Sequence, residues 1–196
     1  MSSTQLQAIT TVRVAQLTST QVQGLTNTVV SSLKTEQLQA LTTMQVPYLT
    51  NAVVSNLSST QINALGTDQI NALLNTQVKV LNTAQVEALT ANQVKALTTG
   101  QLEKLTTSQF AAITASDLVS LSAKQVTSLT SAQVAAMTTS QVAALTKDEV
   151  SGLTTTQVQA LSTSQVSALT SGAIAAFTST QLEALTTAQV SKLTTG

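Results

Sequence analysis

The sequence contains no cysteine, no histidine and no tryptophan, and it has one proline and six glycines among 196 residues. Eight residues are basic and eight are acidic, so the formal net charge is zero. Without cysteine the chain can form neither a disulfide framework nor a cysteine zinc site. Without histidine it lacks the commonest general base and metal ligand. Eight basic residues in a neutral chain do not make a phosphate-binding surface, so we expect no nucleic-acid partner.

Long apolar runs and a targeting segment are also missing. No stretch of about 18 apolar residues is present, so we expect no membrane insertion. The N-terminus does not have the basic start and apolar core of a signal peptide. This absence does not assign the chain to a compartment, because the chain can be a piece of a longer protein.

An eight-residue repeat, or octad, orders what the sequence does contain. Counting registers from Met1, register 1 holds a large aliphatic residue at 24 of 25 positions, with Phe177 as the exception. Register 6 is apolar at all 24 positions, and none of the 16 charged residues falls in either register. No insertion or deletion breaks the frame. We therefore expect one repeat array over residues 1–196, made of 24 octads and four further residues, as part of a longer protein.

The consensus Leu-Thr-Thr-x-Gln-Val-x-Ala carries a helix-start signal. Register 2 is Thr or Ser at 21 of 25 positions, and register 5 is Gln at 18 of 24. The spacing Thr-x-x-Gln is that of a capping box, and the apolar residues of registers 1 and 6 occupy the two positions of a hydrophobic staple. Typical predicted N-caps are Thr90, Thr98, Thr106, Thr130, Thr138 and Thr154. Typical predicted core residues are Leu89, Val94, Leu97, Leu145, Val150 and Leu153.

These patterns predict an all-α solenoid with one helix of about five or six residues in each octad. Such helices are unstable alone and must stack on neighbours. One continuous helix would rotate its apolar rows by about 80° per octad, so it cannot bury them. A β-solenoid remains the alternative, because Thr and Val favour strands. Registers 3, 4 and 7 are expected to face water, and the small residues of register 8 are expected to let helices approach.

The exceptions in register 5 bear on the superhelix. Val29, Val53, Glu149 and Ala173 replace glutamine and share one phase of a 24-residue period. This period predicts three octads per superhelical turn, although an internal duplication explains it equally well.

No residue group points to catalysis, a cofactor or a metal, so we expect a protein that is not an enzyme. The sequence has 59 hydroxyl residues but no histidine to activate one. Lys147-Asp148-Glu149 is the densest charge cluster. Its acidic residues lie in the first turn of a predicted helix, where the helix dipole favours them, so we read it as structural.

The hydroxyl rows provide an alternative function. Threonines of register 3 can form a regular surface array that binds ice, a mineral or a glycan. The residues of this predicted array are Thr99, Thr107, Thr139, Thr155 and Thr163.

The octapeptide consensus resembles repeat tracts of very large, low-complexity bacterial surface or secreted proteins, and the resemblance covers essentially the whole chain. It implies a rod, spacer or interaction scaffold, adhesin-like and located outside the cell or on its surface. No polar repeat caps either end of the array, as independent solenoids require. We therefore expect either a fragment of a longer protein or end-to-end self-association into filaments.

Overall fold

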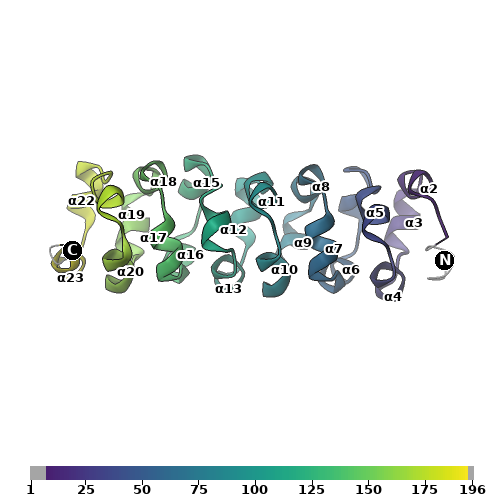
Figure 1. Ribbon diagram of the computed structural model, residues 1–196, viewed down its shortest axis with the longest axis horizontal. Helices are drawn as coiled ribbons and strands as arrows, with labels where there is room; N and C mark the ends of the chain where they lie inside the picture. Colours follow the sequence, from purple (N-terminus) through teal and green to yellow (C-terminus); the bar gives the residue numbers. More distant parts are fainter. Residues whose placement is uncertain (1–7, 194–196) are drawn as a thin grey trace. The chain divides into compact units, whose positions relative to one another are not determined.

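The computed structural model describes residues 8–193 of the chain. These residues form helices only, with no strand among them, so the all-α prediction is confirmed and the β-solenoid is excluded. The structure divides into two compact units, Met1–Leu97 and Thr98–Gly196, and each unit is described by itself. Figure 1 shows the short helices and the connections between them.

The N-terminal unit contains ten α-helices and one 3₁₀ helix among its described residues. Their bounds are α2 Thr11–Ala15, α3 Ser19–Gln23, α4 Asn27–Ser31, α5 Thr35–Gln39, η1 Val46–Tyr48, α6 Asn51–Asn56, α7 Ser59–Ala64, α8 Thr67–Ala72, α9 Asn75–Lys79, α10 Thr83–Glu87 and α11 Ala91–Ala96.

The C-terminal unit contains twelve α-helices among its described residues. Their bounds are α12 Thr99–Lys104, α13 Thr107–Ala111, α14 Ala115–Leu118, α15 Ala123–Thr127, α16 Ser131–Ala136, α17 Thr139–Ala144, α18 Lys147–Gly152, α19 Thr155–Ala160, α20 Thr163–Ala168, α21 Ser171–Ile174, α22 Ser179–Ala184 and α23 Thr187–Leu193.

At many of the described corners between helices, a register-1 and a register-2 residue are both in extended conformation. At the corner before α18, Leu145 has φ −57° and ψ 131°, and Thr146 has φ −78° and ψ 166°. Any L-residue adopts these angles without strain. No described residue has a positive φ, which explains how the chain turns so often with few glycines.

One octad departs from the prediction of one α-helix per repeat. Within residues 41–48 the helix is the 3₁₀ helix η1, Val46–Tyr48, with Pro47 inside it. Proline has no backbone N–H, so it cannot make the α-helical bond to the carbonyl four residues earlier. The Tyr48 N–H instead donates to the carbonyl of Gln45, and the Leu49 N–H donates to that of Val46. The chain still turns the corner at Leu49, so the frame continues.

Registers 1 and 6 form the core of each unit. In the C-terminal unit, Val142 is 0% exposed and Leu145 is 4% exposed. Residues of registers 3, 4 and 7 are mostly exposed and those of register 8 are mostly half-buried, as the repeat pattern predicts. Burying a Leu or Val side chain contributes about 1.5–3 kcal/mol, so this repeated row is the main source of stability.

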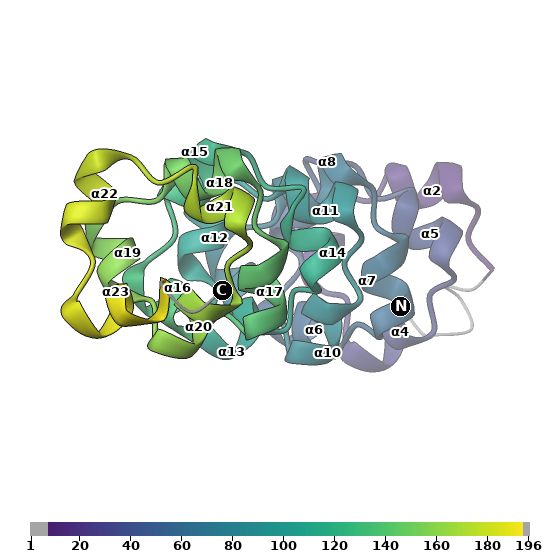
Figure 2. The same ribbon diagram turned by 60° about the vertical axis from the view of Figure 1, so that its left-hand side comes forward.

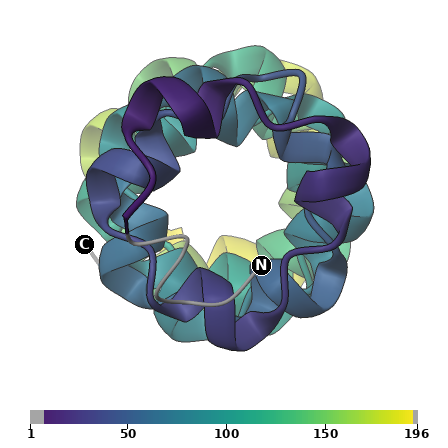
Figure 3. The same cartoon turned by 90° about the vertical axis from the view of Figure 1, so that its right-hand side faces the viewer.

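Within each unit the chain winds as a coil, and helices three octads apart stack on one another. In the N-terminal unit α7 contacts α10, and in the C-terminal unit α17 contacts α20. Figure 3 shows successive helices of the N-terminal unit following one another around a ring, and Figure 2 shows the stacked helices α15, α18 and α21 of the C-terminal unit.

Hydrogen bonds join each coil to the next. The Asn63 side chain donates to the carbonyl of Ala88, 25 residues later. The Gln61 side chain donates to carbonyls 28 and 31 residues earlier. These bonds connect residues of different registers on coils whose helices stack three octads apart.

Candidate functional site

The threonines singled out in register 2 lie at helix N-termini. The Thr90 hydroxyl accepts a hydrogen bond from the Gln93 N–H at 3.3 Å, and Gln93 Oε1 accepts one from the Thr90 N–H at 2.9 Å. Reciprocal bonds of this kind satisfy two backbone donors that a helix start leaves open. The same box is present at α12, α13, α16, α17 and α19, whose N-caps are Thr98, Thr106, Thr130, Thr138 and Thr154.

The glutamine of each box has a second role, which the sequence reasoning missed. Gln141 is only 1% exposed. Its Oε1 accepts from the Thr138 N–H at 2.8 Å. Its Nε2 donates to the carbonyl of Ile113 at 2.7 Å and to that of Phe110 at 3.2 Å. One amide therefore closes the start of its own helix and bonds to the preceding coil.

The same arrangement recurs in both units. We call the buried register-5 glutamines the glutamine row. Its members are Gln37, Gln45, Gln61, Gln69, Gln77, Gln85, Gln93, Gln101, Gln109, Gln125, Gln133, Gln141, Gln157, Gln165, Gln181 and Gln189.

The bonds that are described for these side chains follow one rule. The Nε2 group donates to carbonyls 28, 30 or 31 residues earlier, where a helix of the preceding coil ends. Gln77 bonds to Val46 and Leu49, and Gln157 to Val126 and Leu129. The carbonyl 31 residues earlier also accepts from the backbone N–H of the corner residue, as Val46 does from Leu49. The glutamine row therefore adds a donor from the next coil to the last carbonyls of each helix and corner.

The sequence does carry a signal for this second role. A capping box accepts Glu or Gln at its last position. This chain nevertheless uses glutamine at 18 register-5 positions and glutamate at one. A carboxylate accepts hydrogen bonds but donates none, whereas an amide does both. The preference for the amide indicates that register 5 must also donate.

The glutamine half of the box is present even where the hydroxyl half is missing. Lys34, Gly66 and Leu74 stand in register 2 and provide no capping hydroxyl. Their backbone N–H groups nevertheless donate to the register-5 glutamine at 3.1, 2.8 and 2.7 Å. The helix start therefore keeps its bond to the glutamine where register 2 has no hydroxyl.

The register-5 exceptions each remove part of the contact. Val53 and Ala173 are buried but have no polar group to offer. Asp117 is one methylene shorter than Glu, is half-buried, and its carboxylate accepts from its own cap, Thr114. The two four-residue helices, α14 and α21, are the ones that contain Asp117 and Ala173.

The core residues singled out from the pattern are all buried. Leu89, Leu97, Leu145 and Leu153 are 3–4% exposed, and Val94 and Val150 are 0% exposed.

The threonines of the predicted surface array occupy the first position of their helices. Thr107, Thr139 and Thr155 are exposed, whereas Thr99 and Thr163 are half-buried. Among their helices, α17 and α20 stack and bring Thr139 and Thr163 to successive coils. The other three threonines lie on α12, α13 and α19 at other positions of the coil.

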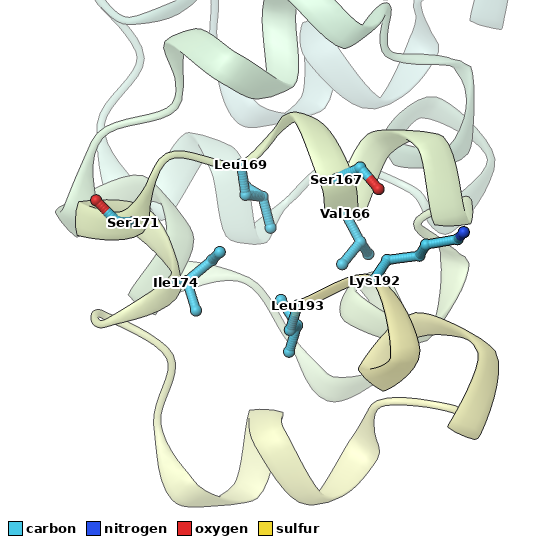
Figure 4. Close-up of a pocket in the computed structure, with 7 residues that line it drawn as sticks. All are labelled: Val166, Ser167, Leu169, Ser171, Ile174, Lys192 and Leu193. Carbon is cyan, nitrogen blue, oxygen red and sulfur yellow. The ribbon is translucent and has the colours of Figure 1, made fainter. Parts of the chain in front are cut away.

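A pocket of about 220 Å³ lies in the C-terminal unit between α20, α21 and α23 (Figure 4). Its wall is mainly aliphatic, and the Lys192 side chain points away from the middle of the pocket. It contains no carboxylate beside a hydroxyl that could act as a base. The lining residues are Val166, Ser167, Leu169, Ser171, Ile174, Lys192 and Leu193.

Neither a metal cluster nor a membrane span is found in residues 8–193. No three carboxylates gather there in a group that could hold an ion. None of the helices described there is long and apolar enough to cross a membrane.

Comparison with known families identifies the repeat. The ALTTAQ repeat family matches residues 48–75, 75–107, 110–147 and 167–195, which together make up more than half of the chain. The chain belongs to the ALTTAQ repeat family. No curated protein matches the sequence. The family assignment agrees with the octad. In Ala-Leu-Thr-Thr-Ala-Gln, Ala occupies register 8 of one octad and Leu-Thr-Thr-Ala-Gln occupies registers 1 to 5 of the next.

Proposed function

We propose that this chain is a non-catalytic structural module, a spacer or interaction scaffold whose size is set by its number of octads. The observation that carries the proposal is the glutamine row. In the octads for which both bonds are described, such as those of Gln77, Gln141 and Gln157, the glutamine bonds to its own helix start and to the coil before it. Because the bonds described for the glutamine row reach back 28 to 31 residues, as Gln189 does to Val158 and Leu161, an added coil needs only its predecessor to make them.

Insertion of whole octads tests this proposal. Four octads copied from residues 137–168 are inserted after Ala168, where they continue the frame. We expect the far-UV circular dichroism per residue to stay unchanged and the maximum dimension in small-angle X-ray scattering to grow by equal steps with each further insertion. A dimension that grows with the cube root of chain length, as in a compact globule, would contradict the spacer role.

We further propose that the module belongs to a bacterial surface or secreted protein. The resemblance of the octapeptide consensus to repeat tracts of such proteins supports this setting. The test is protease treatment of intact cells that produce the whole protein. Cleavage of the repeats without cell lysis is expected, and protection equal to that of a cytoplasmic marker would refute the proposal.

End-to-end self-association of the repeat array remains a prediction that accompanies the proposed spacer role. Sedimentation velocity at increasing concentration tests it, and a strict monomer throughout would contradict it.

A further inference from the structure

One octad departs from the glutamine row by a single group. Glu149 occupies register 5 of α18 and is 2% exposed. It closes its helix start as the glutamines do, because its Oε2 accepts from the Thr146 N–H and from the Thr146 hydroxyl, both at 2.7 Å. Its Oε1 is buried and makes no hydrogen bond, and among the described residues no other buried side-chain nitrogen or oxygen lacks a partner.

The neighbouring octads indicate which atoms of the preceding coil Oε1 meets. Gln141 and Gln157 place Nε2 at the corresponding position, and each donates to carbonyls 28 and 31 residues earlier. The same separations from Glu149 lead to the carbonyls of Leu121 and Leu118. Carbonyl oxygens only accept hydrogen bonds, as does an ionised carboxylate. An ionised Glu149 would therefore place acceptor against acceptor in a buried contact.

A proton resolves this conflict. A neutral carboxyl group carries one O–H donor and has nearly the shape of the glutamine amide. We infer that Glu149 is a proton-binding site in the contact between coils, where the protonated carboxyl donates to the carbonyl of Leu121 as the glutamines donate at the same separation. Loss of the proton leaves a buried negative charge without a donor on that side, and the contact opens.

The size of the contact favours a proton over a metal ion. At the position 28 residues earlier, the flanking glutamines Gln141 and Gln157 place Nε2 at 2.7 and 2.6 Å from the carbonyl oxygen. These separations suit an O–H···O bond. A calcium ion requires six to eight oxygens at about 2.3–2.6 Å from the ion, so it needs a wider cage with more ligands.

The charged groups on the elements packed around Glu149 leave it as the buried titratable group of this contact. Helices α15 and α21 stack on α18. On α18 itself Lys147 and Asp148 are exposed, and on α15 Lys124 is exposed. Helix α21 carries no charged residue, and Asp117 on α14 is half-buried with its carboxylate turned to its own cap.

The proposal predicts the direction in which the stability of the chain changes with pH. The protonated form completes the contact, so its contribution to stability is present at low pH and is lost as the pH rises through the titration of this carboxyl. The variant Glu149→Gln carries a permanent donor and is expected to be independent of this titration. Urea unfolding of the full chain and of the variant, from acidic to alkaline buffer, measures the difference. The unfolding constant of the wild type is expected to exceed that of the variant on the order of tenfold at alkaline pH, because a buried acceptor is then left without a donor. The two constants are expected to converge in acid.

Two controls keep the result specific. Glu103→Gln removes an exposed carboxylate from the same unit and is expected to leave the pH dependence unchanged. The 13Cδ resonance of Glu149 reports its protonation directly and is expected to change over the pH range in which the two unfolding curves diverge. Parallel pH profiles for wild type and Glu149→Gln would overturn the proposal. Stabilisation of the wild type, but not of the variant, by calcium or sodium at alkaline pH would also overturn it in favour of a cation site.

Discussion

The polar side chains that point inward and those that point outward in this repeat are of similar chemistry, uncharged amides and hydroxyls. They differ in the groups to which each side chain bonds. Gln141, on the inside, has an acceptor bonded to one helix start and a donor bonded to the preceding coil. Thr139, on the outside, is exposed at the first position of the same helix. The comparison shows that position, not polarity, separates a polar residue that holds the coils together from one that faces water.

The largest effect is expected in the apolar rows that flank the glutamine row. Leu145→Ala removes a 4% exposed side chain from a register-1 corner. The lost burial and the cavity left behind are expected to lower the free energy of unfolding by about 2–5 kcal/mol. Urea denaturation followed by circular dichroism measures the loss. A change below about 1 kcal/mol would mean that the corner residues are not the core.

A smaller effect is expected at the helix caps. Thr138→Ala removes the hydroxyl that accepts from the Gln141 N–H, and is expected to cost about 1 kcal/mol. The loss is limited because Gln141 still accepts from the backbone N–H of residue 138, as the glutamines do at Lys34 and Gly66. Thr138→Ser keeps the hydroxyl and serves as the matched control. A cost for alanine as large as that of the core substitution would place the hydroxyl, rather than the amide, at the centre of the contact.

The smallest effect is expected on the outside. Thr139→Lys places a charge at an exposed register-3 position, and its free energy of unfolding is expected to stay within about 0.5 kcal/mol of the wild type. The same variant bears on the surface-array alternative, because a lysine interrupts a threonine row without disturbing the fold. Thermal hysteresis of the wild type that the variant abolishes would favour an ice-binding face.

Much of the fold follows from local patterns in the sequence. The Thr-x-x-Gln box and the flanking apolar pair operate within one octad, so they predict each helix start and the corner before it. The break at residues 41–48 is also local, since it follows from the missing N–H of Pro47. The burial of Leu145 and Val150 follows from the uncharged registers in which they stand.

The contact between coils is not local, and the sequence reasoning did not find it. Gln141 meets carbonyls 28 and 31 residues earlier, and that separation depends on how many octads complete a turn. The 24-residue period of the register-5 exceptions predicted three octads per turn, but that period does not say which atoms of successive coils meet. The excess of glutamine over glutamate is the one feature of the sequence that points to a second bond.

The central claim is that the glutamine amide, rather than apolar burial alone, joins successive coils. The most direct test is Gln141→Met, which keeps the length and unbranched shape of the side chain but removes both the donor and the acceptor. Gln159→Met, at an exposed register-7 position, is the matched control. We expect the buried substitution to lower the free energy of unfolding by about 2–4 kcal/mol, because it leaves the Thr138 N–H and the Ile113 carbonyl without partners. The exposed one is expected to change it by less than about 0.5 kcal/mol. Equal stability of the two variants would contradict the account.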